Sequence, residues 1–153
     1  YLDIIQIGSR NMQNFALLRQ VGGLGKPVLL KRGMAATLNE WLLAAEHTLA
    51  GGARGGIFCE RGIQGFDPNT RNLLDLGAVA MLHHSYGLPV IVDPSHAVGR
   101  RDLIPALARA ALACGADGLL LETHPDPAQA LSDGAQALDG RALSDLGEEL
   151  FHG

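Results

Sequence analysis

The feature that most constrains the fold of this chain is a regular alternation of short apolar runs with longer segments of helical period. The apolar runs are nearly continuous, which is typical of strands buried on both faces of a parallel sheet. We expect strands at residues 2–7, 28–30, 56–59, 89–92 and 117–121. We expect helices at 11–21, 37–50, 72–86, 101–114 and 127–138, and a further amphipathic helix at 141–151. The sequence therefore predicts an α/β fold.

Five successive strand–helix units fit two architectures, a doubly wound sheet or part of a (β/α)8 barrel. A complete barrel of this kind needs ~250 residues, whereas this chain has 153. We expect residues 1–153 to form a single domain, and a barrel built from them would be partial. The sequence contains neither GxGxxG nor GxxxxGK(S/T), the motifs that would favour a nucleotide-binding sheet.

Charge and cysteine content exclude several functions. The chain carries 12 Lys and Arg against 16 Asp and Glu, a formal net charge of −4, so it offers no broad basic surface for nucleic acid or an anionic membrane. No apolar stretch reaches the ~18 residues needed to cross a bilayer. Cys59 and Cys114 lie in apolar runs without CxxC spacing, which predicts neither disulfides nor a zinc cluster and indicates a reducing, cytoplasmic setting.

The residues that directly follow each apolar run are the informative ones, because parallel α/β folds bind ligands at the carboxyl ends of their strands. A cation follows each of the first three runs, namely Arg10, Lys31 and Arg61. Taken singly, each has a structural alternative, such as a pairing of Arg61 with its neighbour Glu60. Three cations at equivalent strand ends repel one another unless an anion neutralises them, so together they predict a pocket for phosphate or carboxylate groups.

The last two apolar runs lead to side chains that commonly bind metals. His96 and Glu122 follow these runs, and Asp133 lies in the segment beyond. A lone histidine in such a loop is as often structural as functional, but an imidazole nitrogen with two carboxylates is a set suited to a divalent metal ion. The sequence thus predicts a rim that is anion-binding on one side and metal-binding on the other.

Seven strings of residues stand in a fixed order along nearly the whole chain. They are QIGSRNMQN at 6–14, LKRG at 30–33, CERGI at 59–63, TRN at 70–72, DPSHA at 93–97, ETHPDP at 122–127 and LSDGAQ at 131–136. Together they resemble the 3-deoxy-7-phosphoheptulonate synthase family, in the branch allied to 3-deoxy-8-phosphooctulonate synthase. The resemblance implies the fourth to eighth units of a (β/α)8 TIM barrel, the C-terminal part of such a synthase.

The resemblance also implies a transferase reaction, the aldol-like condensation of phosphoenolpyruvate with erythrose 4-phosphate that opens the shikimate pathway of aromatic amino acid synthesis. By position, Arg10, Lys31 and Arg61 would bind phosphoenolpyruvate, and Lys31 could also donate a proton to the aldehyde oxygen. His96, Glu122 and Asp133 would be three of four ligands to a divalent ion of the Mn, Fe, Co or Zn type, with Lys31 and His96 as the catalytic residues.

The chain departs from the family pattern in ways that bear on activity. The family's fourth metal ligand, a cysteine on the first strand, and its Lys-Pro-Arg segment have no counterpart here. Gln64 and Val98 stand where the family often has arginine and threonine. We expect weak or no turnover from the chain alone, with self-association or a partner chain supplying the first three units.

Two alternative functions stay open. The first is 3-deoxy-8-phosphooctulonate synthase, which would take arabinose 5-phosphate, although LKRG and TRN argue against it. The second is a non-catalytic half-barrel that binds phosphoenolpyruvate and metal without turnover. Assays with both sugars on a completed barrel, beside calorimetry with phosphoenolpyruvate and manganese, separate these possibilities.

Overall fold

A computed structural model describes residues 2–151 and contains one parallel sheet. Its five strands are β1 Ile5–Ile7, β2 Val28–Lys31, β3 Gly56–Glu60, β4 Val90–Val92 and β5 Gly118–Leu119. Each strand pairs in parallel with the next one along the chain, in the order β1-β2-β3-β4-β5. The expected α/β fold with a parallel sheet is confirmed. A doubly wound sheet requires a reversal of strand order, and this sheet has none among the described strands.

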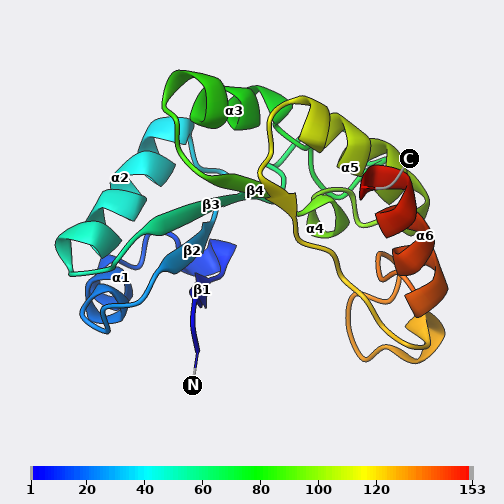
Figure 1. Ribbon diagram of the computed structural model, residues 1–153, viewed down its shortest axis with the longest axis horizontal. Coiled ribbons are helices and arrows are strands. Elements are labelled where there is room, and N and C mark those ends of the chain that lie inside the picture. Colours follow the sequence, from blue (N-terminus) through cyan, green and yellow to red (C-terminus); the bar gives the residue numbers. More distant parts are fainter. Residues whose placement is uncertain (1, 152–153) are drawn as a thin grey trace.

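Helices follow the strands, and several of them lie along the outside of the arch that the chain forms (Figure 1). They are α1 Phe15–Gly22, α2 Leu38–Ala50, α3 Leu76–Ala80, α4 Pro94–Val98, α5 Ile104–Ala113 and α6 Gly140–Phe151. A π-helical turn, Met81–Ser85, continues α3. Short 3-10 turns precede α1 and α5 at Ser9–Asn11 and Arg101–Leu103. In the part of the chain that is described, none of these helices is long and apolar enough to cross a membrane.

Side-chain caps set where the helices begin. Thr37 accepts a hydrogen bond from the Glu40 amide at 3.2 Å, and the Glu40 carboxylate accepts from the Thr37 amide at 2.8 Å. This capping box starts α2 at the residue that the sequence predicts. The helix expected from residue 72 begins later, at Leu76, because Asp75 is its cap and accepts from the Ala78 amide.

The helix expected at 127–138 is wrong. Only Pro127–Gln129 forms a single 3-10 turn, and an irregular loop follows. Asp133 has a left-handed φ of 56°, and a Cβ on Gly134 would lie 2.5 Å from the Pro127 carbonyl oxygen. The chain therefore folds back tightly here, which a helix cannot do. The loop ends beside the sheet, where the Leu138 amide donates to the Glu122 carbonyl at 2.9 Å.

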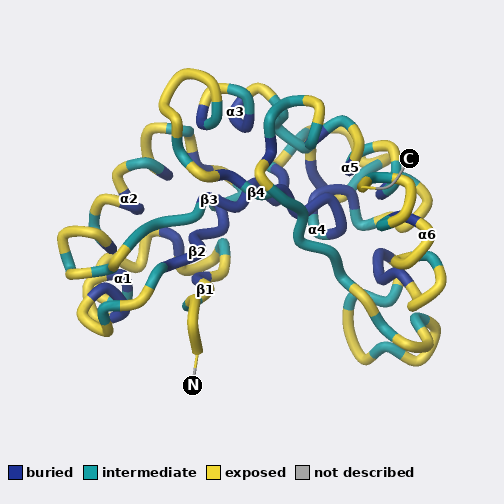
Figure 2. The backbone as a smooth tube through the Cα atoms, in the orientation of Figure 1, coloured by how far each residue is buried: buried dark blue, intermediate teal, exposed yellow. Residues whose placement is uncertain are grey.

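The main core lies between one face of the sheet and the helices that cover it (Figure 2). Trp41 of α2 is fully buried at its centre. Its ring packs edge-on against Phe58 of β3, with 5.1 Å between ring centroids, and its indole nitrogen donates to the Leu30 carbonyl. This packing fixes α2 on β2 and β3, and so fixes the ends of those strands.

The opposite face of the sheet is also apolar. Side chains alternate along each strand, so the residues between those of the main core point to this second face; they are Leu29, Ile57, Cys59 and Ile91. Ile57 and Ile91 remain partly accessible, and Gln6 on β1 is exposed. This second face is therefore apolar, as a core is, but it remains partly exposed. A smaller apolar cluster joins α5 to α6 through Ile104 and Leu146.

Candidate functional site

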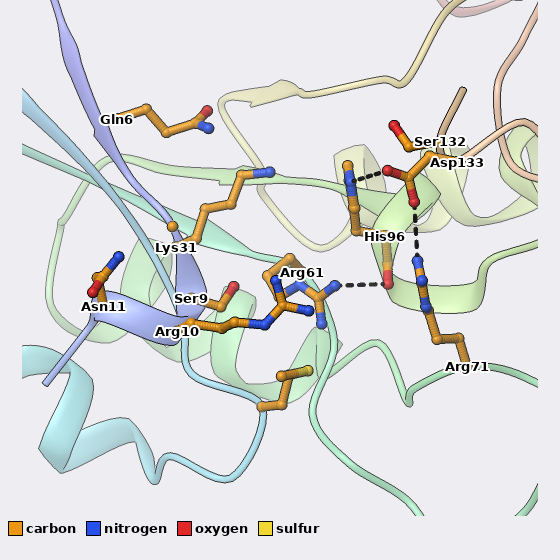
Figure 3. A pocket seen from close by; sticks show the side chains of 12 residues that line it. Gln6, Ser9, Arg10, Asn11, Lys31, Arg61, Arg71, His96, Ser132 and Asp133 are labelled. Carbon is orange, nitrogen blue, oxygen red and sulfur yellow. Dashed lines mark hydrogen bonds and ion pairs between the residues drawn. The ribbon is translucent and has the colours of Figure 1, made fainter. Parts of the chain in front are cut away.

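A pocket of about 630 Å3 lies at the carboxyl ends of the strands (Figure 3). Its lining includes Arg10, Lys31 and Arg61, which follow or end β1, β2 and β3, and also His96 and Asp133. The structure thus brings all three sequence-predicted cations and two of the predicted metal-type residues to one cavity. They meet there because five parallel strands end at the same edge of the sheet.

Arg61 is the most constrained cation of the pocket. The residue is only 8% exposed, and its Nη2 donates to the carbonyl oxygen of His96 at 3.2 Å. Within residues 2–151, its buried Nη1 has no hydrogen-bond partner. Burial lowers the pKa of Arg61, and repulsion from Arg71 lowers it further. Glu60 does not pair with it, because its carboxylate is bonded to Arg32 and to the Gly62 amide. An anion in the pocket would give the unpartnered Nη1 an acceptor and would offset the positive charge of the buried guanidinium.

Lys31 is buried and is held by a carboxylate. Its Nζ donates to Oδ2 of Asp93 at 2.7 Å. The same carboxylate accepts from the His96 amide at 2.9 Å and contacts Nδ1 of that ring at 2.8 Å. Burial alone would raise the pKa of Asp93, but the hydrogen bonds from His96 and the charge of Lys31 hold it below its ordinary value. Asp93 is therefore an anion at neutral pH.

The metal-type side chains lie around the outer nitrogen of His96. Its Nε2 is 3.9 Å from Oε2 of Glu122 and also 3.9 Å from Oδ2 of Asp133. Ser95 holds Glu122 in place, because its Oγ accepts from the Glu122 amide at 3.0 Å. Across residues 2–151, no group of three or more His, Cys, Asp or Glu side chains is gathered tightly enough to hold a metal ion. The three predicted ligands thus lie near one another as two pairs, His96 with Glu122 and His96 with Asp133.

The donor chemistry of these pairs fits a divalent ion of the predicted type. One imidazole nitrogen and two carboxylates are N/O ligands. Nδ1 of His96 contacts a third carboxylate, that of Asp93, an arrangement common around metal-bound histidines. The arrangement can hold a cation only if the carboxylates close in or a further ligand is supplied.

Arg71 is a pocket residue that the site prediction omitted. Its Nη1 lies 3.3 Å from Oδ1 of Asp133, and Gln136 donates to the same oxygen at 2.6 Å. Gly99 makes room for its stem, since a Cβ there would lie 3.1 Å from the Arg71 Cβ. The string TRN marked this segment only as part of the resemblance. Arg71 does not directly follow a strand, so a search of the residues after each strand does not identify it as a pocket residue.

Arg32, the neighbour of Lys31, serves the fold. It is buried, and its Nη1 donates to Glu60 at 2.9 Å and to Asp75 at 2.8 Å. Its guanidinium also lies 5.6 Å from the centre of the Trp41 ring. It does not line the pocket. Lys31, the last residue of β2, and Arg32, which follows it, thus have separate roles, because successive side chains of an extended segment point to opposite faces.

The chain is thus an α/β protein with a sequentially ordered parallel sheet whose strand ends gather cations, a histidine and carboxylates. The family model of the DAHP synthetase I family matches residues 1–151. The chain belongs to this family.

Similarity to individual proteins points the same way. The chain is 52% identical to phospho-2-dehydro-3-deoxyheptonate aldolase of Thermotoga maritima over 98% of its own length and 44% of that protein. It is 37% identical to 2-dehydro-3-deoxyphosphooctonate aldolase of Methylococcus capsulatus over 87% of its length and 50% of that protein. A truncated form of 3-deoxy-D-arabino-heptulosonate 7-phosphate synthase from Thermotoga maritima superposes with a TM-score of 0.95 at 52% identity, covering 98% of this chain and 57% of that one. The chain spans about half the length of these relatives.

Proposed function

We propose that this chain is the C-terminal part of a synthase that condenses phosphoenolpyruvate with erythrose 4-phosphate to give 3-deoxy-7-phosphoheptulonate and phosphate. The observation that carries the proposal is the buried, unpartnered Nη1 of Arg61 in a pocket shared with Lys31 and Arg10. Burying a guanidinium without a partner is costly, and a ligand with a phosphate and a carboxylate offsets that cost.

In this proposal the cations bind phosphoenolpyruvate and orient it. The planar guanidinium groups of Arg10 and Arg61 suit two-point contacts with phosphate or carboxylate. Lys31 is a compact charge with three donors, and Asp93 accepts from its Nζ at 2.7 Å. Its other donors remain for the substrate, and it is the group that would give a proton to the aldehyde oxygen of the acceptor.

His96, Glu122 and Asp133 would hold a divalent ion of the Mn, Fe, Co or Zn type together with a further ligand. When bound, such an ion would polarise the aldehyde or activate water for the reaction. The carboxylates of Glu122 and Asp133 and the imidazole of His96 would give it N/O coordination beside the anion-binding wall.

We further propose that residues 1–153 are one domain and supply the fourth to eighth units of a (β/α)8 barrel. The sequential strand order and the apolar second face of the sheet support this reading. A second copy or a chain carrying the other units would cover that face. Size-exclusion chromatography with light scattering should show self-association or partner binding. A monodisperse monomer that binds no apolar dye would contradict this part.

The function is tested by titrating the chain with phosphoenolpyruvate in a calorimeter, with Mn2+ present. Arg61→Gln should weaken binding by about 10-fold to 100-fold, the loss of a charge-assisted hydrogen bond. Arg54→Gln is the matched control, because Arg54 is exposed and lies outside the pocket. Equal affinities for the two variants, or no binding by the unaltered chain, would overturn the proposal.

The similarity to relatives named 2-dehydro-3-deoxyphosphooctonate aldolase supports a second candidate function, that of a synthase that takes arabinose 5-phosphate. The higher identity to the heptonate aldolase favours erythrose 4-phosphate. Turnover assays with both sugars, on the chain complemented with the first three units, separate the two. Product from the pentose phosphate alone would reverse the choice, and tight binding without product from either sugar would indicate a non-catalytic half-barrel.

A further inference from the structure

Asp93 lies behind the pocket, in contact with two of its lining residues, Lys31 and His96. It follows β4 directly and caps α4, and it is fully buried. Its amide donates to the Glu60 carbonyl of the neighbouring strand at 2.8 Å, so its backbone is fixed by the sheet.

The two oxygens of this carboxylate have different partners. Oδ1 accepts from the His96 amide at 2.9 Å, which is the ordinary cap of a helix. Oδ2 lies 2.7 Å from Nζ of Lys31 and 2.8 Å from Nδ1 of the His96 ring. Capping α4 needs only the first oxygen. The second joins a cation of the anion-binding wall to the imidazole of the other wall.

An ionised carboxylate only accepts hydrogen bonds. At 2.8 Å from Oδ2, Nδ1 of His96 must therefore carry the hydrogen. In the neutral ring this leaves Nε2 as a bare acceptor, and Nε2 is the atom that faces Glu122 and Asp133 at 3.9 Å. The ring thus presents a lone pair in the one direction from which a cation could be bound.

We propose that Asp93 is the positioning residue of this pocket: it fixes His96 as the tautomer with hydrogen on Nδ1 and tethers the ammonium of Lys31 beside it. Its role as a positioning residue rests on the proposed function, while the tautomer can be measured without metal or substrate. Asp93 acts through its two neighbours and does not itself line the pocket.

The chain supplies a closely matched control in Asp75. Asp75 caps α3, and its Oδ1 accepts from the Ala78 amide at 3.0 Å. Its Oδ2 accepts from Arg32 at 2.8 Å, just as Oδ2 of Asp93 accepts from Lys31. Both aspartates therefore cap a five-residue helix and pair with a cation at the end of β2. They differ in burial, since Asp75 is partly exposed, and in that Asp93 contacts the ring of His96.

The test is long-range 15N NMR of the chain labelled at histidine, recorded well above pH ~6.5, where an ordinary imidazole is neutral. The His96 signals are assigned by their loss in His96→Asn. In the unaltered chain we expect hydrogen on Nδ1 and a bare Nε2. In Asp93→Asn, the amide nitrogen that replaces Oδ2 donates toward Nδ1, so the ratio of the two tautomers should shift toward Nε2–H by about tenfold or more.

Asp75→Asn should leave the His96 tautomer as in the unaltered chain. Hydrogen on Nε2 in the unaltered chain, or an unchanged tautomer in folded Asp93→Asn, would overturn the inference. If Asp93→Asn does not fold, the inference is tested by comparing the His96 tautomer in Lys31→Met with that in the unaltered chain. The tautomer should persist in Lys31→Met, because Oδ2 still accepts from Nδ1, and its reversal there would count against Asp93 as its cause. Failure to bind phosphoenolpyruvate would remove the proposed function without moving these signals.

Discussion

The guanidinium of Arg61 donates a hydrogen bond to the carbonyl oxygen of His96 over 3.2 Å. This contact links a cation that follows β3 to the residue whose imidazole lies nearest the carboxylates. An anion held by Arg61 would therefore lie beside any cation held by His96. The relationship depends on tight backbone packing between the segments after β3 and β4.

Gly62, the residue after Arg61, should not tolerate a side chain. Its φ of 93° is left-handed, and a Cβ there would lie 2.7 Å from the Asn72 Cβ and 2.9 Å from the Ala97 Cα. Gly62→Ala should cost about 2–5 kcal/mol of unfolding free energy in urea titrations, from strain and overpacking together. Gly87→Ala isolates the strain, since Gly87 has a φ of 63° with nothing within 4 Å, and it should cost only about 1–2 kcal/mol. Equal costs for both variants would contradict the packing described.

Asp75 should make stability depend on pH in the acid range. Burial alone would raise its pKa, but hydrogen bonds from Arg32 and the Ala78 amide hold that pKa below the ordinary 3.8. A carboxyl whose folded pKa is lowered contributes stability above its unfolded pKa and loses it as pH falls through the folded value.

Asp75→Asn should therefore lower the unfolding free energy at neutral pH by about 1 kcal/mol, since the pair is partly exposed. The difference from the unaltered chain should shrink as pH falls below ~3.9. Urea titrations at a series of pH values check this, with exposed Asp3→Asn as the control. A difference in unfolding free energy that grows on acidification would contradict a lowered pKa of Asp75 in the folded chain.

Trp41 should be the residue whose truncation costs most in the main core. It is fully buried, packs on Phe58 and donates to the Leu30 carbonyl. Trp41→Ala should lower the unfolding free energy by about 3–5 kcal/mol, whereas Leu43→Ala on the exposed side of α2 should stay within about 0.5 kcal/mol. Circular dichroism is the suitable probe, because Trp41 is the only tryptophan in the sequence. Similar losses for both variants would contradict the packing of α2.

His96 should dominate the affinity of the chain for Mn2+. Its Nε2 is the atom shared by both carboxylate pairs, so His96→Asn should weaken binding by more than about 10-fold. Titration monitored by the electron paramagnetic resonance signal of free Mn2+ measures this. His47→Asn is the control, since His47 lies on α2 against Phe15, outside the pocket. Unchanged Mn2+ affinity in His96→Asn would place the ion elsewhere.

The strands and the pocket cations could be predicted because each rests on a local signal. A continuous apolar run marks a strand buried on both faces, and the residue after it must lie at the sheet edge. Lys31 and Arg61 were found in this way, and both line the pocket. The capping box of Thr37 and Glu40 is likewise local, and it marks the start of α2.

Features that depend on tertiary contacts could not be predicted from the sequence. The segment 127–138 has helical spacing, yet Gly134 packs against the Pro127 carbonyl and the chain turns back instead. Arg71 follows no apolar run, and only the fold brings it to Asp133. Lys31 and Asp93, which are hydrogen-bonded, lie 62 positions apart in the sequence. No periodicity or motif spacing reports such a contact.

The most direct test of the account is a crystal structure of the chain with phosphoenolpyruvate and Mn2+. We expect the phosphate or carboxylate of the ligand within hydrogen-bond distance of Nη1 of Arg61 and of Nζ of Lys31, and Mn2+ on Nε2 of His96. Phosphoenolpyruvate bound away from the strand ends, with Nη1 of Arg61 still lacking a partner, would contradict it.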